Sequence, residues 1–275
     1  MYSLLQSRRA RGDAGEPIPS AFKSLEAQGT KFVRGQLSLV AAGGGTGKSA
    51  FMLTQALKSE VPTLYFSADS DAYIQLSRSI AILYVKSMDE ACKWARSGMI
   101  PDTAVEALND PMIRFNYNAS PSLDDLENSV DCYDEVYGEY PALIVVDNIT
   151  NVRGTGDGND SDPFKGLESL MDYLNTMARE TGAHVSGLHH VTGPFNDADK
   201  PIPMSGVKGQ ISRVPAMILT LFKQEEEFGD ALLCVSTVKN RGGKSDPSGQ
   251  KYVELIFNDE MLAIKDRDPS HATFT

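Results

Sequence analysis

The chain has 275 residues, of which 41% are hydrophobic and 23% charged, and its formal net charge is −11. This length suffices for one α/β core with some decoration, so we expect a single domain with a short N-terminal extension. No apolar run is long enough to span a bilayer, and the N-terminus lacks the apolar core of a signal peptide, so we expect a cytoplasmic protein that does not bind membranes. The acidic balance argues against broad, non-specific coating of nucleic acid but allows a narrow basic site.

The first segment, residues 1–16, contains three arginines close to a pair of leucines, and Gly12 and Gly15 interrupt any regular structure there. A short helix and a disordered basic arm are equally compatible with this pattern, and both are kept open. We expect the folded domain over residues 17–265 and a polar tail over residues 266–275. The three cysteines are scattered without CxxC spacing, which indicates reduced thiols rather than disulfides or a zinc site.

A glycine-rich turn follows the apolar run 37–40 and precedes a helical pattern over residues 50–57. Only glycine lets the backbone curl tightly enough for several N–H groups to converge on a phosphate chain. The helix would aim its N-terminal dipole at the same phosphates, Lys48 would reach the β- and γ-phosphates of ATP, and the Ser49 hydroxyl would ligate Mg²⁺. An incidental surface turn is the alternative, which the flanking strand and helix disfavour. The predicted nucleotide-binding residues are Gly43, Gly44, Gly45, Thr46, Gly47, Lys48 and Ser49.

A second buried strand is predicted over residues 62–67, and Asp69 and Asp71 follow it. Catalytic groups of open parallel sheets lie at the carboxyl ends of the strands. We therefore expect Asp69 to orient and deprotonate the water that attacks the γ-phosphate. Asp71 is better placed to cap the next helix. Further helical patterns cover residues 80–98, the stretch that begins near Ser122, and residues 164–181.

The apolar residues 143–146 lead directly into Asp147, the pattern of a Walker B strand whose carboxylate holds the shell of a bound Mg²⁺. The next strand, residues 184–188, delivers His189 and His190 to the same edge of the sheet. Adjacent side chains on a strand point to opposite faces, which argues against a metal site formed by the pair. We expect one of the two histidines to sense the γ-phosphate.

A long loop over residues 192–213 contains Lys200, Lys208 and Arg213 among glycines. Many solvated loops have this composition, but loops of such length in compact domains usually have a function. Three more strands are predicted over residues 216–222, 232–238 and 252–257, and the second of them ends in Lys239-Asn240-Arg241.

Together these motifs resemble the RecA-like ATPase domain of the DnaB-type (superfamily 4) replicative helicases, which include small plasmid RepA and phage relatives. The resemblance covers residues 17–264. It implies an α/β fold with a RecA-like P-loop NTPase core, in which a mostly parallel, twisted sheet is flanked by helices. Ala42, where the strict Walker A pattern has glycine, is the form that the DnaB-type P-loop takes, and Leu143–Asp147 is similar to the Walker B strand of the family.

The resemblance also implies roles for residues around the nucleotide. Asp69 stands where the family has its catalytic glutamate, and His190 stands where it has a phosphate-sensing glutamine or histidine, with His189 still open. Lys239 and Arg241 resemble the Lys-x-Arg by which one subunit reaches the nucleotide of its neighbour. Arg241 would be the arginine finger, with Lys239 as its companion.

Contacts to DNA are implied for the loop that contains residues 205–210, which is similar to the central DNA-binding loop of the family. Lys208 is the leading expected contact to the phosphate backbone. Gly209, Lys200 and Arg213 complete the expected nucleic-acid surface.

The sequence departs from the family in two respects. Asp69 is one methylene shorter than glutamate, so the attacking water would have to lie closer or turnover would be slow. We also expect no separate N-terminal collar or primase domain, and the basic arm at residues 1–15 could instead dock on an adjacent subunit.

We expect an ATPase that forms a homo-oligomeric ring, hexameric by resemblance, and that uses ATP and Mg²⁺ to translocate along single-stranded DNA and unwind duplex DNA. A primase or a loader is a further expected partner. The short form suggests a phage or plasmid source, and hence the cytoplasm of a bacterium or of a phage-infected host. The alternatives are a recombinase of the RecA or RadA type and an ATP-dependent switch that loads or regulates a helicase.

Overall fold

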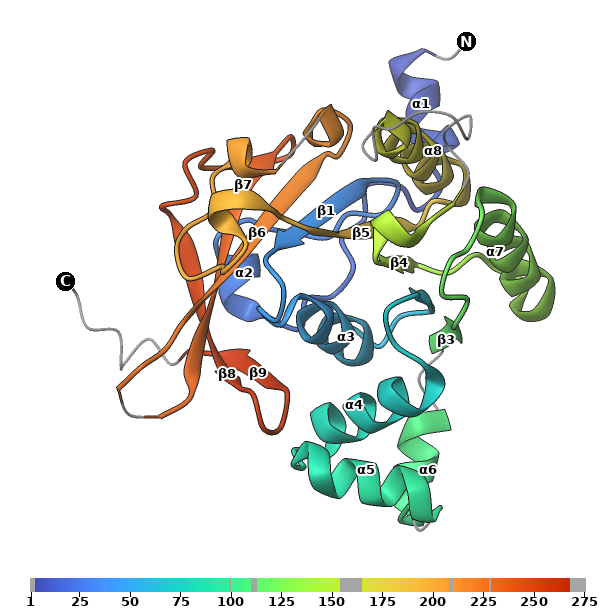
Figure 1. Cartoon of the computed structure of the whole chain (residues 1–275). Helices are drawn as coiled ribbons and strands as arrows, with labels where there is room; N and C mark the ends of the chain where they lie inside the picture. The colour runs from blue at the N-terminus through green and yellow to red at the C-terminus, as the bar shows by residue number, and fades with distance from the viewer. Residues whose placement is uncertain are drawn as a thin grey trace.

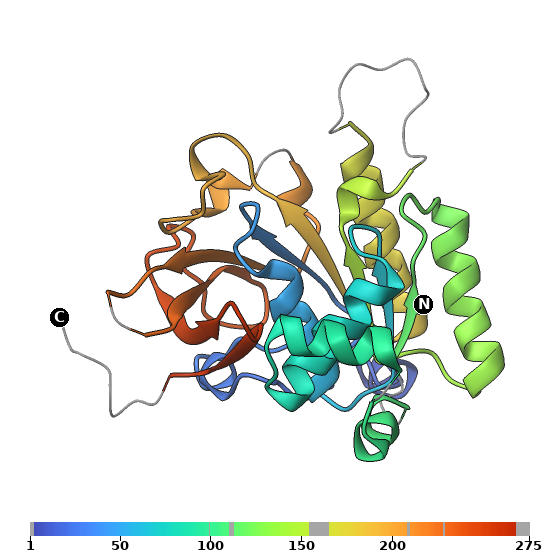
Figure 2. The ribbon, with the colours of Figure 1, turned by 60° about the horizontal axis from the view of Figure 1, so that its bottom comes forward.

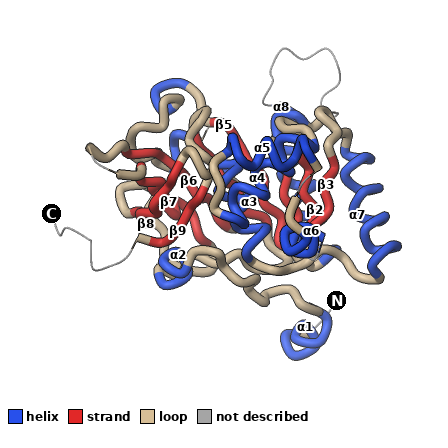
Figure 3. The backbone as a smooth tube through the Cα atoms, turned by 90° about the horizontal axis from the view of Figure 1, so that it is seen from below, coloured by secondary structure: helices blue, strands red, loops and turns tan. Residues whose placement is uncertain are grey.

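One sheet runs through the whole molecule in this computed structural model, which describes residues 3–98, 100–109, 113–153, 165–207, 210–227 and 229–267. Within these ranges nine strands lie in the order β3-β2-β4-β5-β1-β6-β7-β8-β9. The strands are β1 (Leu37–Ala42), β2 (Thr63–Ser67), β3 (Ile113–Asn116), β4 (Leu143–Asp147), β5 (His184–His190), β6 (Met217–Gln224), β7 (Ala231–Asn240), β8 (Tyr252–Asn258) and β9 (Ala263–Asp266). Figure 3 shows this row of strands, from β8 and β9 at one end to β3 at the other.

The sheet changes character at β6. From β3 to β6 all neighbouring strands are parallel, whereas β6, β7, β8 and β9 pair antiparallel. Every residue of β1, β2 and β4 is buried, as expected for parallel strands that are covered on both faces. The predicted fold class, a mostly parallel sheet flanked by helices, is confirmed.

The helices cover both faces of the sheet (Figure 1). They are α1 (Leu4–Ala10), α2 (Lys23–Ala27), α3 (Lys48–Lys58), α4 (Ala72–Tyr84), α5 (Met88–Ser97), α6 (Asp102–Asn109), α7 (Leu123–Tyr137) and α8 (Lys165–Thr181). Helices α7 and α8 bury their apolar faces in one cluster, and α3 buries its own in a second cluster across the sheet. Phe51 of α3 stacks on Phe22 just before α2, which fixes the entry segment against the second cluster.

A lobe of three helices, α4 to α6, projects from the sheet (Figure 2). The helical pattern over residues 80–98 is not one helix, because the chain reverses at Val85, which has a left-handed φ of 51°. Ser87 then caps α5 through the backbone N–H of Glu90. Trp94 is partly buried and packs against the small apolar cluster of this lobe beside Tyr84.

The ends of the chain show one further difference from expectation and decide one alternative that the sequence left open. Residues 252–257 are not the last strand, because β9 follows and pairs with β8. The N-terminal segment contains the helix α1, capped by Ser3, and its Leu4 and Leu5 are 94% and 77% exposed. In the part of the chain that the structure describes, no helix has the length and apolar character needed to cross a membrane.

Candidate nucleotide-binding site

The glycine-rich turn joins β1 to α3 and is held by close contacts on both sides. A Cβ atom on Gly43 would lie 2.1 Å from the carbonyl oxygen of Asn196, so only glycine fits between the two backbones. Gly47 has a φ of 100° and faces the ring of Phe257, and it places Lys48 at the first turn of α3. The Thr46 hydroxyl donates to the Gly43 carbonyl at 3.1 Å, which closes the turn. The local sequence therefore forms a compact cradle at the N-terminus of a helix.

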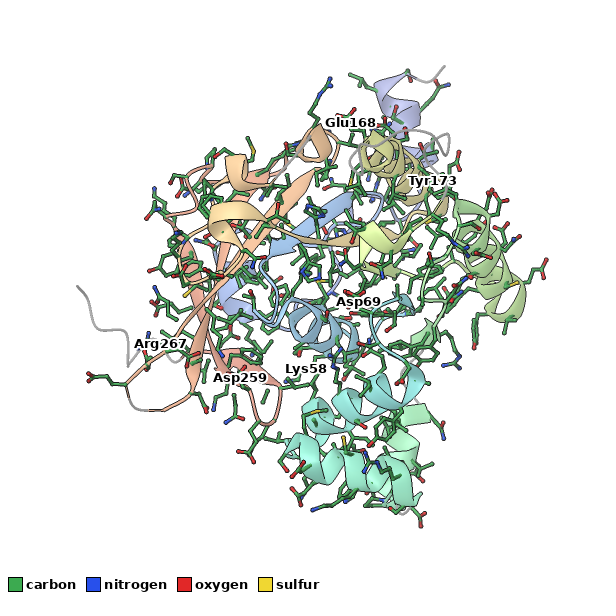
Figure 4. All side chains as sticks on the ribbon, viewed as in Figure 1. Lys58, Asp69, Glu168, Tyr173, Asp259 and Arg267 are labelled. Atoms are coloured by element: carbon green, nitrogen blue, oxygen red, sulfur yellow. The ribbon has the colours of Figure 1, made fainter. Side chains whose placement is uncertain are left out.

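A cleft of about 300 Å³ opens above this cradle. It brings together three of the predicted catalytic side chains, Lys48, Asp69 and His190, from three separate segments. In Figure 4, Asp69 lies on one side of α3, and Asp259 of the β8–β9 hairpin lies on the other. The cleft is lined by Gly43, Gly45, Thr46, Gly47, Lys48, Ser49, Ala50, Asp69, Ser70, Arg78, His190, Phe257, Asp259 and Leu262.

Asp147 at the end of β4 lies beside the cradle, where its carboxylate has one satisfied and one free oxygen. Tyr65 donates its hydroxyl to Oδ2 at 3.0 Å, and the Ser49 side chain lies close enough to influence the pKa of the carboxyl group. Oδ1 is buried without a hydrogen-bond partner among the described residues. Burial raises the pKa of Asp147, against the opposing effects of Ser49, Tyr65 and Lys48. A free carboxylate oxygen next to a serine hydroxyl suits a hard divalent cation, so the two predicted ligands fit Mg²⁺.

Lys48 and His190 are in direct contact, since Lys48 Nζ lies 3.2 Å from His190 Nδ1. Burial lowers the pKa of Lys48, although Asp147 and Asp69 oppose the shift. Burial and the Lys48 charge also lower the pKa of His190, so its Nδ1 accepts from the ammonium and its Nε2 carries the proton. Nε2 lies 3.8 Å from Asp69 Oδ2.

His189 lies on the opposite face of β5, away from the cleft lining. Its Nδ1 is buried and has no hydrogen-bond partner among the described residues, and burial lowers its pKa to about 4. Of the two histidines left open by the sequence, His190 is therefore the one that the structure places beside Lys48 and Asp69.

Asp69 is half-exposed, with 41% of its side chain accessible, and two asparagine amides contact it. Asn151 Nδ2 donates to Oδ1 at 2.9 Å, and Asn148 Nδ2 donates to Oδ2 at 3.4 Å. Asp71, by contrast, accepts a hydrogen bond from the backbone N–H of Ile74 and caps α4, as expected.

Lys239 and Arg241 do not reach this cleft within their own chain. Lys239 Nζ donates to the carbonyls of Ser212 and Arg213 at 2.6 and 2.8 Å, and Arg241 Nη2 donates to the Arg213 carbonyl at 2.8 Å. Burial and the Arg241 charge lower the pKa of Lys239 to about 8.

Arg241 lines a second cleft of about 560 Å³, together with Arg213 and the α8 residues Glu168, Asp172 and Asn175. Figure 4 shows Glu168 on α8, well separated from Asp69. The predicted nucleotide ligands thus divide between two places on one chain.

The expected DNA contacts are only partly described. Lys208 and Gly209 lie outside the described residues. Lys200 is exposed, with its ammonium 5.9 Å from the centre of the Phe195 ring. Arg213 is exposed and lies with Arg241 at the second cleft.

The sequence did not predict a role for Arg78 at the first cleft or for three polar residues beside it. Tyr65 could have been noticed because a buried tyrosine needs a partner for its hydroxyl. Arg78 lines the cleft from α4 and donates to Ser70 Oγ at 2.9 Å. In the sequence, the only indication of its role is its position two helical turns after the helix cap Asp71. Asn148 and Asn151 carried no signal beyond their place after Asp147.

Solved structures show the same fold. A DnaB-like replicative helicase, whose structure was determined together with its interactions with primase, superposes with a TM-score of 0.77 at 17% identity over 96% of this chain. This chain spans 65% of the length of that helicase chain. A second solved structure, an ATPase domain, superposes with a TM-score of 0.78 at 17% identity, over 96% of both chains. The chain therefore has the RecA-like fold of the ATPase domains of DnaB-type helicases.

Among curated proteins, the similarity extends along the whole sequence. The Gene 65 protein of Mycobacterium phage L5 is 59% identical over 97% of this chain and 99% of its own length. The Gene 65 protein of Mycobacterium phage D29 is 60% identical over 84% of this chain and 99% of its own length. No family model matches the chain. The chain belongs to the family of the mycobacteriophage Gene 65 proteins.

Proposed function

We propose that this protein is a ring-forming ATPase that uses ATP hydrolysis to move along single-stranded DNA and to unwind duplex DNA. The observation that carries the proposal is the cleft in which Lys48, Asp69 and His190 meet beside Asp147. Phosphoryl transfer depends on positioning and charge neutralisation more than on covalent chemistry, and these are the groups it needs.

Each side chain has a distinct part in the proposed reaction. The cradle from Gly43 to Ser49 binds the phosphate chain of ATP, and Lys48 neutralises its charge. Ser49 and Asp147 would hold Mg²⁺, which draws charge from the phosphate oxygens when it is bound. Asp69 accepts a proton from the attacking water.

His190 is the proposed sensor of the γ-phosphate. Its Nδ1 accepts from Lys48, and its Nε2–H points toward the side where Asp69 lies. A γ-phosphate that draws the Lys48 ammonium away would change the hydrogen bonds of the imidazole. The strand that carries His190 leads into the loop at residues 192–213, so loss of the γ-phosphate would be felt where DNA is expected to bind.

The shared active site rests on Lys239 and Arg241. Both lie away from the cleft of their own chain, which supports a role at the nucleotide of a neighbouring copy. A homo-oligomeric ring, with six subunits as the expected number, would bring them there. Lys200, Lys208, Gly209 and Arg213 would then contact single-stranded DNA in the central channel.

The DnaB-like neighbour was solved with its interactions with primase, so a primase or a loader is a reasonable partner for this protein. The second candidate function is an ATP-dependent switch that loads or regulates a helicase. The short side chain of Asp69 favours it, because slow hydrolysis suits a switch better than a motor.

The test is steady-state ATP hydrolysis at several protein concentrations, with and without single-stranded DNA. A motor with shared sites predicts stimulation by DNA and a specific activity that rises with concentration. The Arg241→Ala variant should lose activity while nucleotide still binds. Arg179→Ala, which removes an exposed arginine of α8 outside both clefts, is the matched control. Turnover that ignores both DNA and Arg241 would support the switch instead.

A further inference from the structure

The turn after β4 faces the carboxylate of Asp69 and donates one amide hydrogen bond to each of its oxygens. Asn151 Nδ2 lies 2.9 Å from Oδ1, and Asn148 Nδ2 lies 3.4 Å from Oδ2. The two asparagines come from residues 148–151, which include a short 3₁₀ turn at Ile149–Asn151. Each oxygen of the carboxylate therefore accepts a hydrogen bond from the same short segment.

Thr150 sets the direction of both amides. Its backbone N–H and its hydroxyl donate to Asn148 Oδ1 at 3.2 and 2.9 Å, and the hydroxyl also lies 3.4 Å from Asn151 Oδ1. Because the oxygen end of each amide faces Thr150, the nitrogen end faces Asp69. Asn148 is only 2% exposed, so its orientation is further fixed by packing.

Two cationic or donor groups compete with the asparagine amides for the carboxylate. His190 Nε2 lies 3.8 Å from Oδ2, and the charge of Lys48 is close enough for Asp69 to influence the Lys48 pKa. A short, half-exposed carboxylate without donors behind it would turn toward these groups. The asparagine amides donate to the carboxylate without adding charge, so they hold its orientation.

We propose that Asn148 and Asn151 are positioning residues that aim Asp69 at the attacking water, and that Thr150 keeps both amides in the donating orientation. The proposal rests on the proposed ATPase function. In the step that they support, the water oxygen forms a bond to the γ-phosphorus and its proton passes to Asp69. The bond from the γ-phosphorus to the bridging oxygen breaks, and its electron pair leaves with ADP.

This arrangement also joins the two halves of the reaction. Asn148 directly follows Asp147, so the same short segment carries the proposed metal ligand and a group that orients the proposed base. A shift in β4 would move Asp147 and Asn148 together, so the attacking water and the phosphate would keep their relative positions.

The experiment compares Asn151→Leu with the wild type in single-turnover and steady-state ATP hydrolysis. Loss of one hydrogen bond to a charged group predicts a kcat about tenfold lower. KM for ATP and the affinity for a fluorescent ATP analogue should change less than about twofold, because Asn151 acts on the chemical step. Asn116→Leu is the matched control, since its amide donates to Ser129 between β3 and α7, away from Asp69, and its kcat should equal that of the wild type.

A double-mutant cycle separates positioning from a merely structural role. In an Asp69→Asn background, Asn151→Leu should cause no further loss, because the group on which it acts is already gone. An equal loss in both backgrounds overturns the proposal, as does unchanged or increased hydrolysis in Asn151→Leu alone. If Asn151→Leu does not fold, Asn151→Asp keeps the shape of the side chain and replaces the donor with a like charge, so its kcat should fall further than about tenfold; an unchanged kcat overturns the proposal.

The failure of the proposed function would look different. A wild type without ATP hydrolysis, or an Asp69→Asn variant with full activity, would remove the function or the base itself. An active wild type that needs Asp69 but is indifferent to Asn151 would remove only the present inference.

Discussion

The two clefts of this protein use the same kinds of side chain in opposite ways. In the first cleft, the side chains proposed to bind phosphate face one another, and beside them a carboxylate oxygen of Asp147 is unpaired among the described residues. At the second, the donors of Arg241 in the cleft and of Lys239 nearby bind backbone carbonyls of their own chain. The first cleft therefore suits the phosphates of a nucleotide, and Lys239 and Arg241 are cations that the proposed function brings to the phosphate of another copy. A site of each kind on one chain is what a shared active site requires.

The strongest test of this difference between the clefts mixes two variants, each of which has lost the function of one cleft. Arg241→Ala should lower kcat for ATP hydrolysis about 10³-fold, the lower end of the range for an arginine finger, while nucleotide affinity is retained. Lys48→Ala should abolish nucleotide binding in its own chain. Mixing the two inactive variants should restore activity, because an intact Arg241 can then serve an intact cradle. Mixtures that stay inactive at every ratio would contradict a shared site.

The packing of the first cleft can be tested at its glycines. Gly43→Ala would force a methyl group against the Asn196 backbone, so we expect a loss of about 2–3 kcal/mol in the free energy of unfolding. Gly44→Ala is the matched change, because no atom lies within 4 Å of its new Cβ, and its stability should stay close to that of the wild type. Denaturant unfolding of both variants measures the difference, and equal values would show that the two backbones are not in contact.

A residue outside both clefts supplies a baseline for pH effects. Burial lowers the pKa of His184 to about 4, and the neutral ring bonds to Val33 and Ser38. In the unfolded chain His184 has an ordinary pKa of about 6.5. Between about pH 6.5 and 4 it is therefore protonated in the unfolded chain but neutral in the folded chain. The contribution of His184 to stability is therefore complete above about pH 6.5 and declines toward about pH 4.

His184→Gln should remove this decline. Between about pH 7.5 and pH 5, the wild type should lose about 1–2 kcal/mol more of its unfolding free energy than the variant. Urea unfolding at the two pH values makes the measurement. Parallel losses in the two proteins would mean that His184 is not buried in the neutral form.

The smallest expected effect concerns Lys239, which binds the Ser212 and Arg213 carbonyls. Its pKa of about 8 means that its positive charge is lost as the pH rises through that value. If the charge helps to stabilise the γ-phosphate of a neighbour, kcat should fall by about threefold between about pH 7.5 and 9.5, as for a partly exposed ion pair. The Lys239→Arg variant keeps its charge over this range, so its kcat should stay nearly constant as the pH rises. The same fall in kcat in the variant would mean that another group, and not Lys239, causes the decline.

Much of the fold could be predicted from the sequence because parallel strands buried on both faces leave long apolar runs, as at Leu143–Asp147. The strand β9 was missed because its four residues carry only one fully buried side chain, Ile264, and no clear alternation. The break at Val85 was missed because the apolar pattern continues across it, while the backbone conformation that separates the two helices leaves no mark in the pattern.

The candidate site could also be predicted only in part, because some of its contacts depend on the whole fold. Motif and strand order suffice to bring Lys48, Asp69 and Asp147 to one edge of the sheet. The choice of His190 over His189 requires knowing which face of β5 the P-loop helix covers, and that depends on the whole sheet. The amides of Asn148 and Asn151 reach Asp69 across 79 and 82 residues of sequence, so no local pattern could pair them.

The bonds from Lys239 and Arg241 to the Arg213 carbonyl have an energetic consequence. Arg213 is exposed, so water can take the place of the departing cation at its carbonyl. Leaving that carbonyl therefore costs little, since it is not stranded away from solvent. In the proposed function, Arg241 could therefore move between this resting place and the phosphate of a neighbouring copy with a small free-energy difference, a step that would recur at every turnover.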